Sequence, residues 1–188
     1  KTTTMKMLTG LLDITEGSAR LLGEPVDASD LGTRLHIGYM SQLFSLYEEL
    51  TVRQNLELHA KLYRMDPATA DQDIQESLSR FELTDHAGTL PSSLSLGVRQ
   101  RLQLAAACLH RPQVLILDEA TSALDIDAQT KIETAIAGLR GHITILAIAH
   151  TASLVALADI IVHLDRGRVV QVRTNNAVKD EDVVAAAE

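Results

Sequence analysis

The segment VLILDEATSALD, residues 114–125, constrains the fold of this chain more than any other part of the sequence. Its first four residues are all apolar, the pattern of a central parallel strand that is covered on both faces. Asp118 and Glu119 follow at the carboxyl end of that strand, where open α/β sheets place their ligands. Two adjacent carboxylates there suit a magnesium ion and an attacking water. The structural alternative is an acidic helix start, because helix N-termini also favour Asp and Glu.

The chain begins with Lys1-Thr2-Thr3-Thr4, which resembles the end of a phosphate-binding loop, G-x-x-x-x-G-K-[ST], without its glycines. In the complete loop, backbone N–H groups surround the phosphates, the lysine reaches the β- and γ-phosphates, and the following hydroxyl binds magnesium. Lys1 and Thr2 would fill the last two roles. A bare Lys-Thr pair carries almost no information, so the interpretation depends on the helix that should follow. Apolar residues at helical spacing predict that helix: Met5, Leu8, Leu11 and Leu12.

The composition limits the class of protein. With 188 residues, of which 46% are hydrophobic, the chain can bury a sizeable core as one domain or as one domain with an inserted lobe. A net charge of −8 argues against nucleic-acid binding through a broad basic face. No apolar run reaches the roughly 18 residues that are needed to span a bilayer. These features are typical of a globular protein.

Strands and helices alternate along the sequence, with a block of helices in the middle. This order predicts an α/β fold in which a parallel-sheet core carries a helical insertion. The predicted helices cover residues 52–65, 70–83, 96–109, 127–139 and 152–158, and the predicted strands lie near residues 17–23, 37–42, 114–117, 142–150, 160–164 and 168–172. We divide the chain into a discontinuous α/β core, residues 1–42 and 113–174, a helical subdomain, residues 43–112, and a tail, residues 175–188.

Five motifs occur along the chain: Lys1-Thr2, YMSQ ending at Gln42, LSLGVRQRL beginning at Leu94, VLILDEATSALD, and AIAH ending at His150. Their order resembles the ATP-binding subunit of an ABC transporter over the whole length of the chain. The resemblance implies a P-loop NTPase fold, with a mostly parallel sheet and an inserted α-helical subdomain, that binds ATP and Mg²⁺. Taken alone, Gln42 would be an ordinary loop amide and His150 a structural histidine at a strand end.

The resemblance also implies a role for each matching position. Asp118 would be the carboxylate on the magnesium side, Glu119 the general base that polarises the attacking water, and His150 a contact of the γ-phosphate. Ser95 and Gly97 would close over the nucleotide of a second subunit. The remaining predicted contacts are Lys1, Thr2, Thr3 and Gln42 with the nucleotide, Thr2 and Gln42 with magnesium, and Asp125 in the loop that communicates across the dimer.

The sequence departs from the family pattern in two places. Residues 94–98 read L-S-L-G-V where the family has L-S-G-G-Q, so Leu96 replaces a glycine. Leucine lacks the backbone freedom of glycine, and we expect a weaker or altered phosphate contact. The loop glycines and the aromatic residue that stacks on adenine are absent from the sequence. We therefore expect the 188-residue chain by itself to bind nucleotide poorly and to be inactive.

These expectations describe an ATPase subunit that forms a head-to-tail dimer and drives a membrane permease from the cytoplasmic face of the cell membrane. Parts of the sequence resemble drug-export ATPases and others resemble exporters with fused membrane and ATPase domains, so we favour export, without a nucleic-acid partner. Phe44 and Tyr47 are either permease contacts or core residues. Two alternatives stay open: a soluble ABC-type ATPase that acts on ribosomes or nucleic-acid complexes, and a non-catalytic regulatory subunit.

Overall fold

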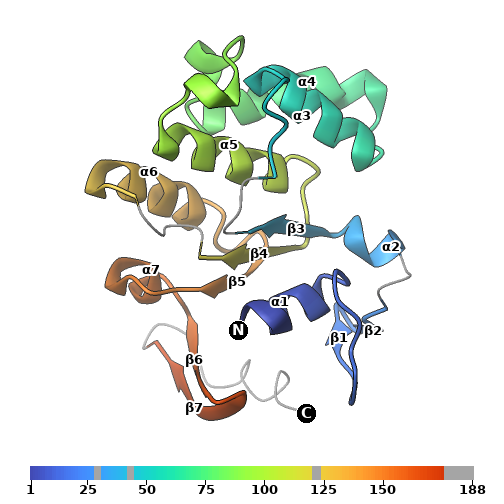
Figure 1. Cartoon of the computed structure of the whole chain (residues 1–188), viewed down its shortest axis with the longest axis vertical. Coiled ribbons are helices and arrows are strands. Elements are labelled where there is room, and N and C mark those ends of the chain that lie inside the picture. The colour runs from blue at the N-terminus through green and yellow to red at the C-terminus, as the bar shows by residue number, and fades with distance from the viewer. Residues whose placement is uncertain (28–30, 42–44, 120–123, 176–188) are drawn as a thin grey trace.

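The computed structural model describes residues 1–27, 31–41, 45–119 and 124–175, and these residues form the α/β architecture that the alternating pattern predicts (Figure 1). A parallel sheet lies in the middle of the molecule, and the helices that follow its first strand extend away from it. The helices are α1 (Thr2–Leu8), α2 (Leu31–Arg34), α3 (Val52–Leu62), α4 (Pro67–Arg80), α5 (Leu96–Cys108), α6 (Ile126–Ala137) and α7 (Ala152–Ala156), with short 3-10 turns η1 (Thr84–His86) and η2 (Pro91–Ser93). The strands are β1 (Arg20–Leu21), β2 (Glu24–Pro25), β3 (Ile37–Met40), β4 (Val114–Asp118), β5 (Thr144–Ile148), β6 (Ile160–Asp165) and β7 (Arg168–Thr174).

Strand β4 is the centre of a three-stranded parallel sheet in the order β3-β4-β5. All of its residues are buried, as the run of apolar residues predicts. Leu115 and Leu117 pack in the large core with α5 and α6, whereas Val114 and Ile116 pack in a smaller core with α1. Both faces of the sheet are therefore covered. Because side chains alternate along a strand, the next even-numbered residue, Asp118, falls on the α1 face.

The helical block between β3 and β4 is confirmed, with shifted helix ends. Helix α3 begins with a capping box between Thr51 and Gln54 and ends before Met65, because Arg64 adopts a left-handed backbone with φ 54°. Helix α4 begins at Pro67, because Asp66-Pro67 is a helix-start signal ahead of the periodic residues 70–83. The Asp66 carboxylate accepts a hydrogen bond from the N–H of Ala68 at 2.9 Å, and proline is favoured in the first helical turn.

Helix α1 is shorter than the apolar spacing predicts. It ends at Leu8, and Leu11 and Leu12 lie beyond it with exposed side chains. Gly10 has φ 66°, its N–H donates to the carbonyl of Met7 at 3.0 Å, and the N–H of Leu11 donates to the carbonyl of Lys6 at 2.8 Å. These two bonds form a Schellman motif, which terminates the helix. The extension of the helix to Leu12 was therefore wrong.

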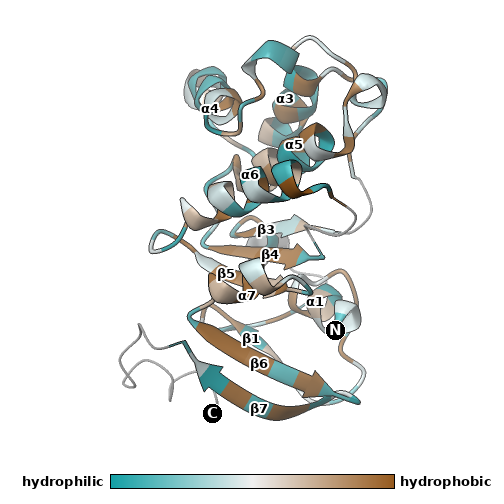
Figure 2. Ribbon diagram, turned by 90° about the vertical axis from the view of Figure 1, so that its left-hand side faces the viewer, coloured by the Kyte–Doolittle hydropathy of each residue, from teal (hydrophilic) through white to brown (hydrophobic). Residues whose placement is uncertain are grey.

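Two antiparallel pairs flank the parallel sheet. Only Arg20–Leu21 of the predicted strand at residues 17–23 forms a strand, and it pairs with β2. Strands β6 and β7 form the predicted hairpin, whose turn residues Arg166 and Gly167 both have positive φ angles, as a type I′ turn requires. Figure 2 shows that this hairpin carries hydrophobic residues, and several of its valines are exposed. Within the described residues, no helix has the length and apolar composition to cross a membrane.

A buried asparagine holds the loop that precedes α3. Asn55 is fully buried, and its amide oxygen accepts from the N–H of Tyr47 at 2.9 Å. Its amide nitrogen donates to the carbonyls of Tyr47, Leu50 and Thr51 at 2.9–3.0 Å. These bonds satisfy a polar side chain that would otherwise be costly to bury. They also fix residues 47–51, which leaves the Tyr47 side chain 49% exposed at the surface.

Candidate functional site

Asp118 lies at the centre of a small polar cluster at the end of β4. Its side chain is almost completely buried, with 2% exposure. The Thr2 hydroxyl at the start of α1 donates to Asp118 Oδ1 at 3.1 Å, and the Tyr39 hydroxyl of β3 donates to Oδ2 at 3.4 Å. Both donors are neutral hydroxyl groups. The two hydrogen bonds therefore stabilise this buried carboxylate, although neither donor carries a positive charge. Thr2 and Asp118, residues from opposite parts of the sequence that the resemblance assigns to one magnesium site, are therefore in contact.

Tyr39 is a member of this cluster that the sequence analysis missed. It pairs in register with Ile116 on β4, which places its side chain on the α1 face beside Asp118. Burial, together with the negative charge of Asp118, raises the pKa of Tyr39. The tyrosine therefore stays protonated and keeps its hydrogen atom for the carboxylate. The sequence signal that could have indicated this role is the position of Tyr39 in the apolar strand that precedes the helical block.

Glu119 points to a different partner from Asp118. The His150 Nε2 atom lies 3.2 Å from Glu119 Oε1. The strand register explains the meeting: Asp118 pairs with Ile148 at the end of β5, so the residues just beyond both strand ends are neighbours. Glu119 has φ 58°, a left-handed conformation that costs a non-glycine residue roughly 1–3 kcal/mol and that clusters at functional sites. The adjacent carboxylates thus have separate surroundings.

The other residues predicted to contact nucleotide are placed as follows. Lys1 and Thr3 are exposed at the start of α1, close in sequence to the Thr2–Asp118 contact. Gln42 lies outside the described residues, as does Phe44. Asp125 occupies the N-cap position of α6, where its carboxylate accepts from the N–H of Ala128 at 2.8 Å. The described part of the site therefore combines the start of α1 with the ends of β4 and β5.

Residues 94–98, which depart from the family pattern, lie at the start of α5. The Ser95 hydroxyl accepts from the N–H of Val98 at 3.4 Å, which caps the helix. Leu96 is the first residue of α5, and it is not among the described non-glycine residues with a positive φ angle. The backbone at Leu96 therefore does not adopt a conformation that favours glycine, and the weaker or altered phosphate contact stays a prediction. The Leu96 side chain is 40% exposed, so its effect would come from its bulk at the surface.

Gly97 has a packing role that its motif did not indicate. A Cβ atom built on Gly97 would lie 2.5 Å from the Cβ atom of Ala128 on α6. Real side chains do not approach this closely, and the Ala128 methyl has no rotamer by which it could move away. Glycine thus lets α5 and α6 cross closely, so the first turns of the helices that begin after Ser95 and Asp125 lie side by side.

Gly97→Ala is expected to destabilise the fold by about 1–3 kcal/mol, because overpacking forces the two helices apart. Urea denaturation measures the effect. Gly88→Ala is the matched control, since a Cβ atom at Gly88 meets nothing within 4 Å. In an Ala128→Gly background the space is restored, and Gly97→Ala should no longer be destabilising. Equal stability of the Gly97→Ala and Gly88→Ala variants would show that the contact is not close.

The donor set around Asp118 fits a magnesium ion. A carboxylate and a hydroxyl are oxygen ligands of the kind that Mg²⁺ prefers, and they lie within hydrogen-bond distance of each other. Among the described residues there is no group of three or more His, Cys, Asp or Glu side chains that could hold a metal. Mg²⁺ usually needs only one or two carboxylates, because water and substrate phosphates complete its shell. Asp118 and Thr2 are the residues that would hold it.

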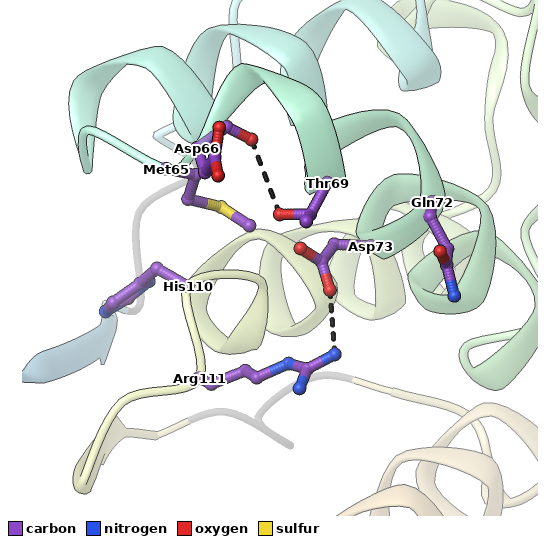
Figure 3. A pocket seen from close by; sticks show the side chains of 7 residues that line it. All are labelled: Met65, Asp66, Thr69, Gln72, Asp73, His110 and Arg111. Carbon is purple, nitrogen blue, oxygen red and sulfur yellow. Dashed lines mark hydrogen bonds and ion pairs between the residues drawn. The ribbon is translucent and has the colours of Figure 1, made fainter.

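A pocket of about 360 Å³ lies apart from this cluster, between the start of α4 and the turn after α5 (Figure 3). Arg111 donates to Asp73 at 2.7 Å, so the positive charge is already paired. Burial lowers the pKa of His110 to about 4, which keeps this histidine neutral. The pocket therefore has no free cation for a phosphate. None of the predicted site residues lines it; its lining is Met65, Asp66, Thr69, Gln72, Asp73, His110 and Arg111.

Comparisons with known proteins point to one protein family. The model of the family described as ABC transporter matches residues 1–122. A probable multidrug ABC transporter ATP-binding protein of Escherichia coli is 42% identical over 125 residues, which are 66% of this chain and 22% of that protein. A daunorubicin resistance ATP-binding protein of Streptomyces coeruleorubidus is 35% identical over 183 residues, 96% of this chain and 58% of that protein. Proteins named for the import of sulfate and thiosulfate, methionine or trehalose also match.

The fold has solved counterparts. The dimeric structure of a post-hydrolysis state of an ATP-binding cassette, bound to ADP and Pi, has a TM-score of 0.81 and 26% sequence identity, and the match covers 92% of this chain and 79% of that one. The predicted P-loop NTPase fold of an ATP-binding cassette is therefore confirmed. The chain spans only 22% to 58% of the length of the two curated relatives described above.

Proposed function

The chain belongs to the ABC transporter family, and from this premise we propose that it binds and hydrolyses ATP as one subunit of a head-to-tail dimer that powers export through a membrane permease. One observation carries the proposal. Two adjacent carboxylates at the end of β4 have different neighbours, with Asp118 beside Thr2 and Glu119 beside His150. Such a division suits a reaction that needs both a cation site and a proton acceptor.

Glu119 is the general base of the proposed reaction. It orients a water molecule for in-line attack on the γ-phosphorus and accepts a proton from it as the new P–O bond forms. The bond between the γ-phosphorus and the bridging oxygen breaks, and ADP leaves with the electron pair. His150, whose Nε2 atom lies 3.2 Å from Glu119 Oε1, holds the base in place, and in the proposal it also contacts the γ-phosphate. Lys1 stabilises the negative charge that develops on the phosphate oxygens.

Asp118 and Thr2 form the cation side of the same site. Bound there, Mg²⁺ supplies charge stabilisation to the β- and γ-phosphates. The burial of Asp118 keeps its carboxylate away from bulk water and in one orientation. Tyr39 donates to the second carboxylate oxygen, Oδ2, so Oδ1 and the Thr2 hydroxyl are the oxygen atoms that would hold the ion. Gln42 completes this side in the proposal.

The second subunit closes the site in our proposal. Ser95 and the N-terminus of α5 would approach the γ-phosphate bound to the partner, because a helix N-terminus and a hydroxyl favour an anion. The dimeric ATP-binding cassette structures to which this fold is similar support the arrangement. Close packing of α5 on α6 at Gly97 would then transmit movement of this segment to Asp125, the residue that caps α6.

The loop at residues 47–51 is the proposed contact with the permease at the cytoplasmic face of the membrane. Asn55 fixes this loop, and the aromatic side chain of Tyr47 stands exposed on it. Aromatic residues on a rigid surface are favoured at protein interfaces. The multidrug and daunorubicin resistance names of relatives support export as the direction of transport.

The test uses a protein in which a complete phosphate-binding loop precedes Lys1. We expect Mg²⁺-dependent ATP hydrolysis, and we expect the tagged protein in its native cells to sediment with membranes and to be released by detergent. Association with ribosomes that survives removal of the membranes would favour the ribosome-associated alternative. Binding of ATP without turnover, in the presence of the permease, would favour the regulatory alternative.

A further inference from the structure

A glutamate outside the family motifs anchors the segment that carries His150. Glu133, on α6, receives three hydrogen bonds at Oε1: from the Ser153 hydroxyl at 2.6 Å, from the Gln129 amide at 2.8 Å and from the Thr151 hydroxyl at 3.5 Å. Gln129 also donates to the Ser153 hydroxyl at 2.9 Å, which closes the cluster. Thr151 and Ser153 lie one and three residues after His150 in the sequence. The carboxylate therefore ties α6 to the turn that carries this histidine.

The start of α7 depends on such an anchor. This helix has only five residues, and its N-cap residue, Thr151, makes no side-chain capping bond within the helix. Leu154 is buried in the core and fixes one side of the helix. The bonds to Glu133 fix the first turn, just after the histidine. A charged acceptor forms shorter and stronger hydrogen bonds than a neutral one, so a carboxylate suits this task.

The same helix also follows Glu119 in the chain. Asp125 caps α6 shortly after Glu119, and Glu133 lies two turns further along. One rigid helix thus begins next to the segment that carries the general base and holds the segment that carries its histidine partner. The His150 side chain is 61% exposed, so packing around the ring does little to orient it.

We infer that Glu133 is a positioning residue, which holds the turn at residues 151–153 against α6 and thereby keeps His150 within hydrogen-bond distance of Glu119. The effect of Glu133 on turnover rests on the proposed ATPase function. Its effect on the contact between His150 and Glu119 does not. The two effects are therefore measured separately.

The first measurement is an NMR spectrum of the imidazole of His150, assigned by the signal that His150→Gln removes. In the chain with native Glu133, Glu119→Gln should shift this signal, because the carboxylate contact is lost. In a Glu133→Ala background the same substitution should shift it much less, since the ring has already moved away. Asp127→Ala is the matched control on the same helix: the Asp127 carboxylate is 83% exposed and pairs with Lys131 at 3.5 Å.

An undiminished response of His150 to Glu119→Gln in the Glu133→Ala background would overturn the inference. If Glu133→Ala unfolds the chain, Ser153→Ala carries the same test, because it removes the shortest of the three donors from the other side. Glu133→Gln should retain part of the response, since glutamine keeps the shape and one acceptor oxygen.

The second measurement is turnover in the protein with a complete phosphate-binding loop. Glu133→Ala should lower kcat by about tenfold, at the low end of the scale for misplaced catalytic groups, with little change in KM. In a His150→Ala background it should have almost no further effect, because the residue that it positions is gone. An equal loss in both backgrounds would mean that Glu133 stabilises the fold without acting through His150. Absence of ATPase activity in every variant would contradict the proposed function and leave the NMR result standing.

Discussion

Glu119→Gln is expected to lower steady-state ATP hydrolysis by a factor of about 100 or more, the scale of a lost general base, while ATP still binds. Glutamine has the shape of glutamate but cannot accept the proton of the attacking water. The substitution also leaves Asp118, Thr2 and Tyr39 unchanged, because their hydrogen bonds do not involve Glu119. The assay compares phosphate release with nucleotide binding in the protein that carries a complete phosphate-binding loop. Glu16→Gln, at an exposed position outside the proposed site and the proposed permease contact, is the control.

The backbone conformation of Glu119 predicts that Glu119→Gln leaves the stability of the protein unchanged. Glu119 has a left-handed backbone, which glutamine tolerates no better and no worse than glutamate, so the two proteins should have nearly the same free energy of unfolding. A loss of activity with unchanged stability identifies the missing carboxylate as the cause. Turnover close to that of the unsubstituted protein would remove Glu119 from the reaction.

Ser95→Arg is expected to abolish ATP-dependent dimerisation and turnover while each monomer still binds ATP. In the proposed dimer, Ser95 faces the nucleotide of the partner and not its own, so a bulky side chain blocks closure without touching the phosphate loop. Light scattering in the Glu119→Gln background, with and without ATP, measures the association. Dimerisation that is indifferent to Ser95→Arg would contradict the composite site.

Ser95→Arg also removes the cap of α5, which is expected to cost about 1 kcal/mol of stability. Ser95→Ala separates the two effects, because it loses the same cap without adding bulk. The two variants should therefore have similar free energies of unfolding, whereas only Ser95→Arg should fail to dimerise. If neither variant dimerises, the cause is the loss of the helix cap or of the serine hydroxyl. Bulk at the interface would then not be the cause.

The sequence contained the signals that determine the sheet and that indicate the residues of the proposed magnesium site. Residues 114–117 are buried between two apolar clusters because an uninterrupted apolar run suits a strand that is covered on both faces. The resemblance implied that Asp118 and Thr2 belong to one magnesium site, and their side chains are in hydrogen-bond contact. Helix ends were less predictable, since Gly10 and Arg64 stop helices through backbone conformations that apolar spacing does not encode.

The sequence did not reveal contacts that depend on how elements pack. The Tyr39 hydroxyl reaches Asp118 only because β3 and β4 align in one particular register. Gly97 is close to Ala128 because two helices cross there, and no pattern near Gly97 encodes that crossing. The bonds of Glu133 to the turn after His150 likewise join two segments that are separate in the sequence. Such contacts require the tertiary arrangement.

The central claim is that the two adjacent carboxylates have separate tasks, and ATP binding with and without Mg²⁺ tests it most directly. Calorimetric titration of Asp118→Asn and Glu119→Gln, each with a complete phosphate-binding loop, compares the two positions. We predict that Mg²⁺ no longer strengthens ATP binding in Asp118→Asn, whereas it strengthens binding in Glu119→Gln as much as in the unsubstituted protein. Equal loss of the Mg²⁺ effect in both variants, or its retention in Asp118→Asn, would contradict the account.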